Sequence, residues 1–114
     1  MTTIYHNPRC SKSRQTLALL EEHGVAPDII NYLNSPPDKD TLKTLVKALG
    51  VSVREIIRTG EDDYQALGLA DTALTDEQLL DAVSHHPKLL QRPIVVKGKQ
   101  AVIGRPPENV LTLL

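Results

Sequence analysis

A single cysteine lies among cationic side chains near the start of the chain. The 114 residues contain one cysteine, Cys10, and its surroundings follow a His-x3-Cys-x3-Arg spacing formed by His6, Cys10 and Arg14. Arg9 and Lys12 add positive charge beside it. A thiolate is the active nucleophile, and nearby cations favour it over the thiol. The pattern predicts a reactive cysteine, although a lone cysteine is more commonly an inert, buried small hydrophobe.

The residue three positions after Cys10 is Ser13, where a Cys-x-x-Cys redox motif has its second cysteine. With one cysteine the chain cannot form an internal disulfide. An enzyme built on Cys10 therefore needs a thiol from another molecule to turn over more than once.

Two arginines stand directly before prolines. Arg92 precedes Pro93 and Arg105 precedes Pro106, which places both arginines in loops at element boundaries. A guanidinium group binds tetrahedral oxyanions through paired hydrogen bonds better than an ammonium group does. Arg92 and Arg105 are thus candidate oxyanion ligands, and the sequence leaves open whether they meet Cys10.

The composition argues against several classes of protein. A net charge of −1, from 13 basic and 14 acidic residues, is unlike that of a general nucleic-acid or anionic-membrane binder. No apolar run approaches the roughly 20 residues that span a bilayer. The first residues lack the features of a signal peptide, so we expect a cytoplasmic protein. One cysteine and four scattered histidines make no zinc pattern, and no metal is expected.

Apolar spacing and turn signals predict an α/β fold. A strand over residues 3–5, a helix from near Cys10 to Gly24 and a strand over residues 28–33 form a strand–helix–strand unit. Such a unit implies a parallel pair of strands.

The middle third of the chain reads as helical. Signals for helix starts recur there at Asp38, at the Ser52/Glu55 capping box, whose short helix is expected to run through Arg58, and at the Thr75/Gln78 capping box.

The last third predicts a hairpin followed by a helix. Strands over residues 94–97 and 101–104 flank a tight turn at Gly98. The final helix is expected to carry Val110, Leu111 and Leu114.

The whole chain resembles the ArsC family of glutathione- and glutaredoxin-coupled arsenate reductases. The resemblance implies a thioredoxin-like βαβ…ββα core with an all-helical insertion over about residues 38–91, within one domain of residues 1–114. The segments that carry it are Ile4–Arg14, Tyr32–Pro37, Val53–Arg58, Leu67–Ala70, His86–Pro87, Arg92–Val96 and Gly104–Pro107.

The resemblance also implies residue roles. Cys10 would be the nucleophile, with His6 and Arg14 helping to keep it ionised. Pro93 would be the cis-proline that faces the active cysteine. The implied oxyanion ligands are Arg58, Arg92 and Arg105.

The implied reaction reduces arsenate to arsenite. The thiolate attacks arsenic, glutathione attacks the adduct, and glutaredoxin supplies electrons. Glutathione is thus a co-substrate rather than a bound cofactor, and we expect no nucleic-acid or membrane partner and, by default, a monomer.

Two alternatives stay open at this point. The chain could be an ArsC-family thiol reductase for another oxyanion or for a mixed disulfide. It could also be a non-catalytic, Spx-like regulator that binds RNA polymerase. Those regulators usually carry a Cys-x-x-Cys switch, and Ser13 breaks that motif here.

Overall fold

The computed structural model describes residues 2–114, so Met1, the first residue of the predicted domain, lies outside the described residues. The chain forms two compact units. The first ends at Ser35 and resumes at Arg92, and the second spans Pro36–Gln91. The single-domain organisation stays a prediction, and the units are described in turn. Among residues 2–114, every helix is too short or too polar to cross a bilayer.

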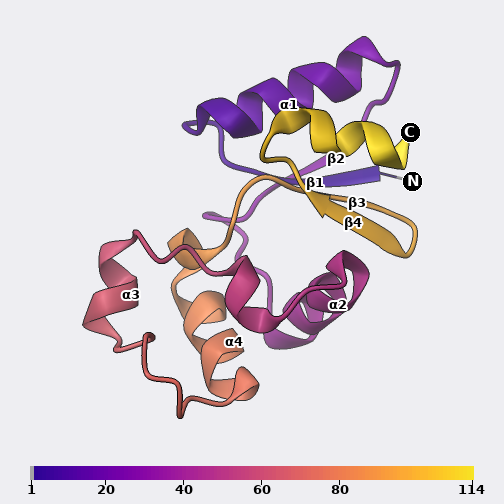
Figure 1. Ribbon diagram of the computed structural model, residues 1–114. Coiled ribbons are helices and arrows are strands. Elements are labelled where there is room, and N and C mark those ends of the chain that lie inside the picture. Colours follow the sequence, from indigo (N-terminus) through magenta and orange to yellow (C-terminus); the bar gives the residue numbers. More distant parts are fainter. Residues whose placement is uncertain (1) are drawn as a thin grey trace. The chain divides into compact units, whose positions relative to one another are not determined.

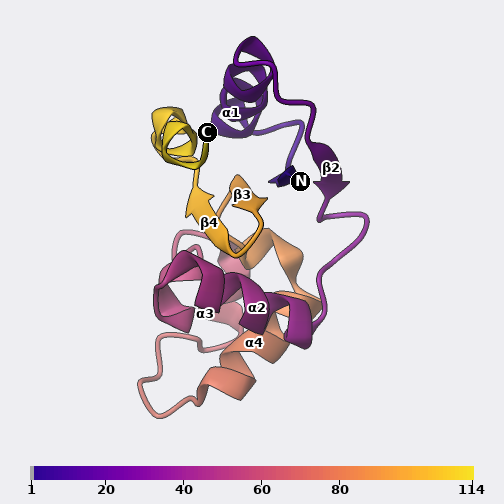
Figure 2. The same ribbon diagram turned by 90° about the vertical axis from the view of Figure 1, so that its right-hand side faces the viewer.

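The first unit contains a sheet with the strand order β2-β1-β3-β4 (Figure 2). Its strands are β1 (Thr2–His6), β2 (Asp28–Asn31), β3 (Ile94–Lys97) and β4 (Gln100–Ile103). β1 and β2 are parallel, whereas β3 is antiparallel to both β1 and β4. Helix α1 (Ser11–Glu22) makes the crossover that a parallel pair requires. The predicted strand–helix–strand unit and the hairpin are confirmed.

Strand β2 is shorter than the predicted strand over residues 28–33. The Asn31 side chain accepts a hydrogen bond from the Leu33 N–H at 3.2 Å, and the Asn31 carbonyl accepts one from the Asn34 N–H at 3.1 Å. These bonds turn the chain, as asparagine side chains commonly do. Tyr32 therefore lies just beyond the end of β2.

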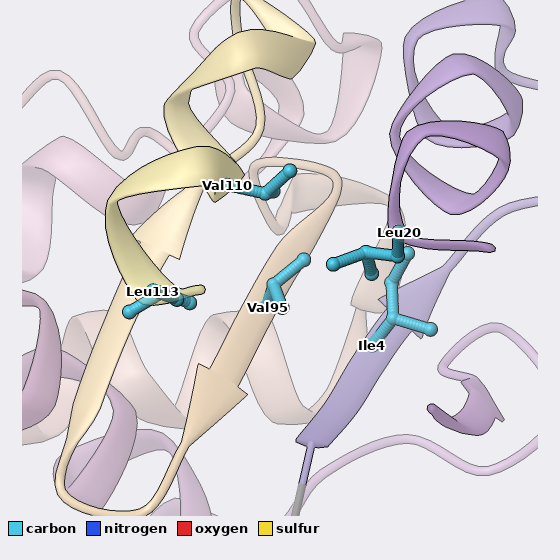
Figure 3. Close-up of a cluster of buried hydrophobic side chains, with 5 residues drawn as sticks. All are labelled: Ile4, Leu20, Val95, Val110 and Leu113. Atoms are coloured by element: carbon cyan, nitrogen blue, oxygen red, sulfur yellow. The ribbon is translucent and has the colours of Figure 1, made fainter. Parts of the chain in front are cut away.

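Helix α1 and the 3₁₀ helix η3 (Pro107–Leu113) cover the same face of this sheet (Figure 1). Together with β1 and β3 they enclose an aliphatic core, which fits a sequence without Trp or Phe (Figure 3). Burying one such side chain stabilises the fold by about 1.5–3 kcal/mol. The core residues are Ile4, Leu20, Val95, Val110 and Leu113.

The last helix ends at Leu113, one residue before the predicted Leu114. Leu111 and Leu114 are exposed, whereas Pro107, Val110 and Leu113 are buried. The helix is 3₁₀, with three residues per turn, so side chains three positions apart share a face.

The second unit is helical. Its elements are α2 (Lys39–Leu49), η1 (Val53–Ile56), α3 (Asp62–Ala66), α4 (Asp76–His85) and η2 (Pro87–Leu89).

Local capping signals placed most of these helices correctly. The Asp38 side chain accepts a hydrogen bond from the Thr41 N–H at 2.8 Å, and both capping boxes form. The helix expected through Arg58 instead stops at Ile56, because Ile57 turns extended and forms a β-bridge with Leu90.

Gly104 is a point of close approach between α1 and the hairpin. A Cβ atom at Gly104 would lie 2.6 Å from Thr16 Oγ1 and 2.8 Å from Pro93 Cγ. The Gly104 N–H donates to the Pro93 carbonyl at 2.8 Å, so the backbone cannot retreat easily. Thr16 is itself buried and donates to the Lys12 carbonyl at 2.8 Å. A side chain has no room at this contact.

Replacing Gly104 should therefore destabilise the protein. We expect Gly104→Ala to lower the free energy of unfolding by about 1–3 kcal/mol, the usual effect of overpacking. Gly60→Ala is the matched control, because no atom lies within 4 Å of the added carbon there. Urea unfolding of both variants measures the difference. Equal stability of the two would contradict the close approach.

Candidate active site

The strand register brings several loop segments to one edge of the sheet. His6 ends β1 opposite Asn31, the last residue of β2. Ile94 begins β3 opposite Tyr5 and also pairs with Ile103, the last residue of β4. The chain therefore leaves β1, β2 and β4, and enters β3, at the same edge.

The Cys10 loop and two of the predicted arginines meet at this edge. The loop follows β1, Arg92 lies two residues before β3, and Arg105 lies two residues after β4. The Gly104 N–H bonds the Pro93 carbonyl and thereby extends the β3–β4 pairing toward both arginines. The backbone segments that carry Arg92 and Arg105 therefore lie at the same edge as the Cys10 loop, which the sequence left open. The Arg92 side chain reaches the Cys10 sulfur, whereas Arg105 is exposed.

Cys10 is the N-cap residue of α1. Its backbone is extended, with φ −92° and ψ 122°, and its N–H donates to the Asn7 carbonyl at 3.0 Å. The first N–H groups of a helix have no partner within the helix. Those of Lys12 and Ser13 lie beside the half-buried sulfur of Cys10 and favour its thiolate. The start of α1 is therefore built to hold a negative charge on sulfur.

The pKa of the Cys10 thiol is lower than its ordinary value. Burial alone raises this pKa, but three neighbours together outweigh burial. They are the Ser13 N–H, the Arg92 guanidinium and the Lys12 N–H. Burial likewise opposes the charge on Arg92, whose pKa is nonetheless raised by its contacts with Cys10 and Tyr32. More thiolate is thus present at neutral pH than in an ordinary cysteine.

His6 takes part in an uncharged hydrogen-bond network. Its Nδ1 lies 2.7 Å from the Oγ of buried Ser13, which also accepts the Asn7 N–H at 3.0 Å. Burial, and then the charge of Arg14, lower the pKa of His6, so the ring is neutral at pH 7.

The implied roles of His6 and Arg14 stay predictions, and the charges near the sulfur point elsewhere. A neutral His6 contributes no positive charge to Cys10, and the groups that lower the pKa of the thiol do not include Arg14. The Arg14 guanidinium instead donates to the Pro8 carbonyl at 3.0 Å and fastens the loop before Cys10. The cation beside the sulfur is Arg92, which lies far away in the sequence.

Three residues join this site without having been predicted for it. Ser13, which interrupts the Cys-x-x-Cys motif, bonds the His6 ring and the Asn7 N–H. Asn7 and Tyr32 are both buried. An Asn-Pro pair shortly before the cysteine and a polar residue at the third helical position were the available signals.

Comparison with known proteins identifies the family. Residues 5–113 match the model of the ArsC family. The chain belongs to the ArsC family. Among its relatives, this ArsC-family chain is 54% identical to the uncharacterised YfgD protein of Escherichia coli K12, covering 97% of this chain and 94% of that protein. It is 47% identical to a protein of Neisseria meningitidis serogroup A named arsenate reductase, covering 97% and 96%.

A solved structure also resembles the ArsC-family chain over nearly its whole length. The arsenate reductase from Vibrio cholerae superposes with a TM-score of 0.98 at 52% identity, covering 99% of this chain and 97% of that one. The predicted thioredoxin-like α/β class is confirmed by this likeness and by the sheet order.

Arg58, the third implied oxyanion ligand of this ArsC-family chain, belongs to the second unit. Its Nε lies 3.8 Å from Glu61 Oε1, and its backbone N–H donates to the Leu89 carbonyl at 2.7 Å. Its Nη1 is buried and makes no hydrogen bond within residues 2–114. A share in an oxyanion site stays a prediction for Arg58.

In the first unit, the peptide bonds before Pro93 and Pro106 are both cis.

The contribution of Arg92 to the reactivity of Cys10 can be measured directly. We expect Arg92→Ala to raise the pKa of the thiol, because the variant loses a charged hydrogen bond to sulfur. The pH dependence of iodoacetamide alkylation then shifts to higher pH, and the rate at pH 7 falls. Arg54→Ala removes an equal charge from a side chain that bonds the Leu69 and Asp71 carbonyls, and it should leave the profile in place. The reverse ranking would contradict the geometry.

Proposed function

We propose that this ArsC-family protein reduces arsenate to arsenite through the Cys10 thiolate, with glutathione and glutaredoxin as electron donors. The observation that carries the proposal is the setting of the sulfur. It is held between the Arg92 guanidinium and two backbone N–H groups at the start of α1. Relatives at 45–47% identity are named arsenate reductase, which supports arsenate as the substrate.

The physical difficulty in this reaction is charge. A thiolate must approach a tetrahedral oxyanion that is also negative, so cations and N–H donors are needed around both groups. Helix N-termini and guanidinium groups are the usual ligands of such anions. Arg92 lies next to the sulfur, and Arg105 leaves the sheet at the same edge. Arg58 is included on the basis of the resemblance.

The proposed reaction begins when the Cys10 thiolate forms a bond to arsenic and one arsenic–oxygen bond breaks, the oxygen leaving as water. Glutathione replaces a second oxygen, which also leaves as water. A glutaredoxin thiolate then attacks the glutathione sulfur; the bond between that sulfur and arsenic breaks, its electron pair reduces arsenic from +5 to +3, and a glutathione–glutaredoxin disulfide forms. Water finally cleaves the bond between Cys10 and arsenic, which releases arsenite and the thiol. Because the sequence has one cysteine, glutathione and glutaredoxin supply the other thiols.

The function is tested by arsenate-dependent NADPH oxidation, coupled through glutathione, glutathione reductase and a glutaredoxin. We expect turnover that needs both glutathione and Cys10, and we expect Cys10→Ser to abolish it with the fold intact. Full activity in Cys10→Ser would rule out Cys10 as the nucleophile. Absence of turnover with a still reactive Cys10 would favour another oxyanion or a mixed disulfide, for which phosphate, sulfate and arsenate competition is the next measurement.

The oxyanion ligands are tested one at a time. Each of Arg58→Ala, Arg92→Ala and Arg105→Ala removes about 1.5–3 kcal/mol of charged hydrogen bonding, so kcat/KM for arsenate should fall roughly 10- to 150-fold. Arg54→Ala is the control, since Arg54 donates to the Leu69 and Asp71 carbonyls at 2.8 Å and 2.6 Å. Its loss should leave kcat/KM unchanged. Normal kinetics in all three test variants would rule out the proposed ligands.

A further inference from the structure

Tyr32 carries a buried hydroxyl group that packing alone does not explain. Its side chain is fully buried, and within residues 2–114 its hydroxyl oxygen makes no well-formed hydrogen bond. A buried polar group without a good partner costs stability, and phenylalanine would fill the same space without that cost. The hydroxyl therefore calls for another role.

The strand register places Tyr32 in one row with Asn7 and Arg92. Because His6 lies opposite Asn31 in parallel strands, Asn7 and Tyr32 are the residues that directly follow the ends of β1 and β2. Because Tyr5 lies opposite Ile94 in antiparallel strands, continuing that pairing by two residues sets Asn7 beside Arg92. The row thus runs from Tyr32 through Asn7 to Arg92, across the edge where Cys10 lies.

The side chains agree with this backbone arrangement. Burial raises the pKa of Tyr32, and the nearby Arg92 and Asn7 oppose that rise. The phenol is therefore neutral at pH 7, with its oxygen facing donor groups. Arg92 and Cys10 are the charged and titratable groups that act on it.

We propose that Tyr32 is a positioning residue for Cys10, its hydroxyl dipole holding the Arg92 guanidinium against the sulfur. An arginine side chain is long and flexible and carries only donors, so each fixed acceptor beside it narrows the positions of its guanidinium group. The Tyr32 oxygen offers a second, fixed acceptor. Because that oxygen is not exposed, a substrate cannot touch it, and Tyr32 acts through Arg92.

The role is tested on the thiol itself, and only an effect on arsenate turnover would rest on the proposed function. Tyr32→Phe keeps the ring and its packing but removes the hydroxyl. We expect its iodoacetamide alkylation profile to shift to higher pH, with the rate at pH 7 falling about two- to fivefold, the size of one weak hydrogen bond. Tyr64→Phe, in α3 of the second unit, is the matched control and should match the wild type. An unchanged profile for Tyr32→Phe overturns the proposal.

A double-mutant cycle separates positioning from general loosening of the fold. In an Arg92→Ala background, Tyr32→Phe should have no further effect on alkylation, because the group it positions is gone. If Tyr32→Phe lowered the alkylation rate by the same factor with and without Arg92, the proposal would be overturned. Alkylation needs neither arsenate nor glutathione, so failure of the proposed function would leave this result intact.

A third variant tests the same role even if Tyr32→Phe fails to fold. Arg92→Lys retains the charge but loses the planar fork that Tyr32 and Cys10 share. We expect its alkylation profile also to shift to higher pH. A wild-type profile would mean that charge alone suffices, and the positioning role would be wrong.

Discussion

The half-buried anionic sulfur of Cys10 is the constraint on which the rest of the site depends. Burial disfavours the thiolate, so the protein must supply enough donors and positive charge at that point to reverse the effect. Two N–H groups come from the start of α1 without further elements. The guanidinium of Arg92 comes from the segment before β3, more than eighty residues later, and it reaches the sulfur only when the sheet is assembled.

Sheet register therefore couples stability to chemistry in the first unit. A slip of one residue between β1 and β3 would turn side chains to the opposite face and move Arg92 away from the sulfur. The close contact of Gly104 with Thr16 and Pro93 fastens α1 to the hairpin at the same edge. The aliphatic core under α1 and η3 supplies the cohesion, while the His6–Ser13–Asn7 network shapes the Cys10 loop without adding charge.

Some features followed directly from the sequence because their causes are local. The Thr75 capping box joins residues three apart, and the hairpin turn at Gly98 needs only its neighbours. The position of Cys10 at the beginning of a helix follows in the same way, as does the predicted parallel pair of strands. The full family resemblance adds the thioredoxin-like class and the implied oxyanion ligands, of which Arg58 stays a prediction.

Only the tertiary structure decided the interactions between distant segments. Pairing of β1 with β3 made Arg92, rather than Arg14, the cation at the sulfur, and burial made His6 neutral. Packing of η3 against the sheet buries Leu113 and leaves Leu114 exposed. The sequence by itself determined which residues could do chemistry and which elements carry them, since helix caps and turns depend on near neighbours. Only the folded sheet decided which of those residues meet, because charge and desolvation depend on distances that spacing along the chain does not define.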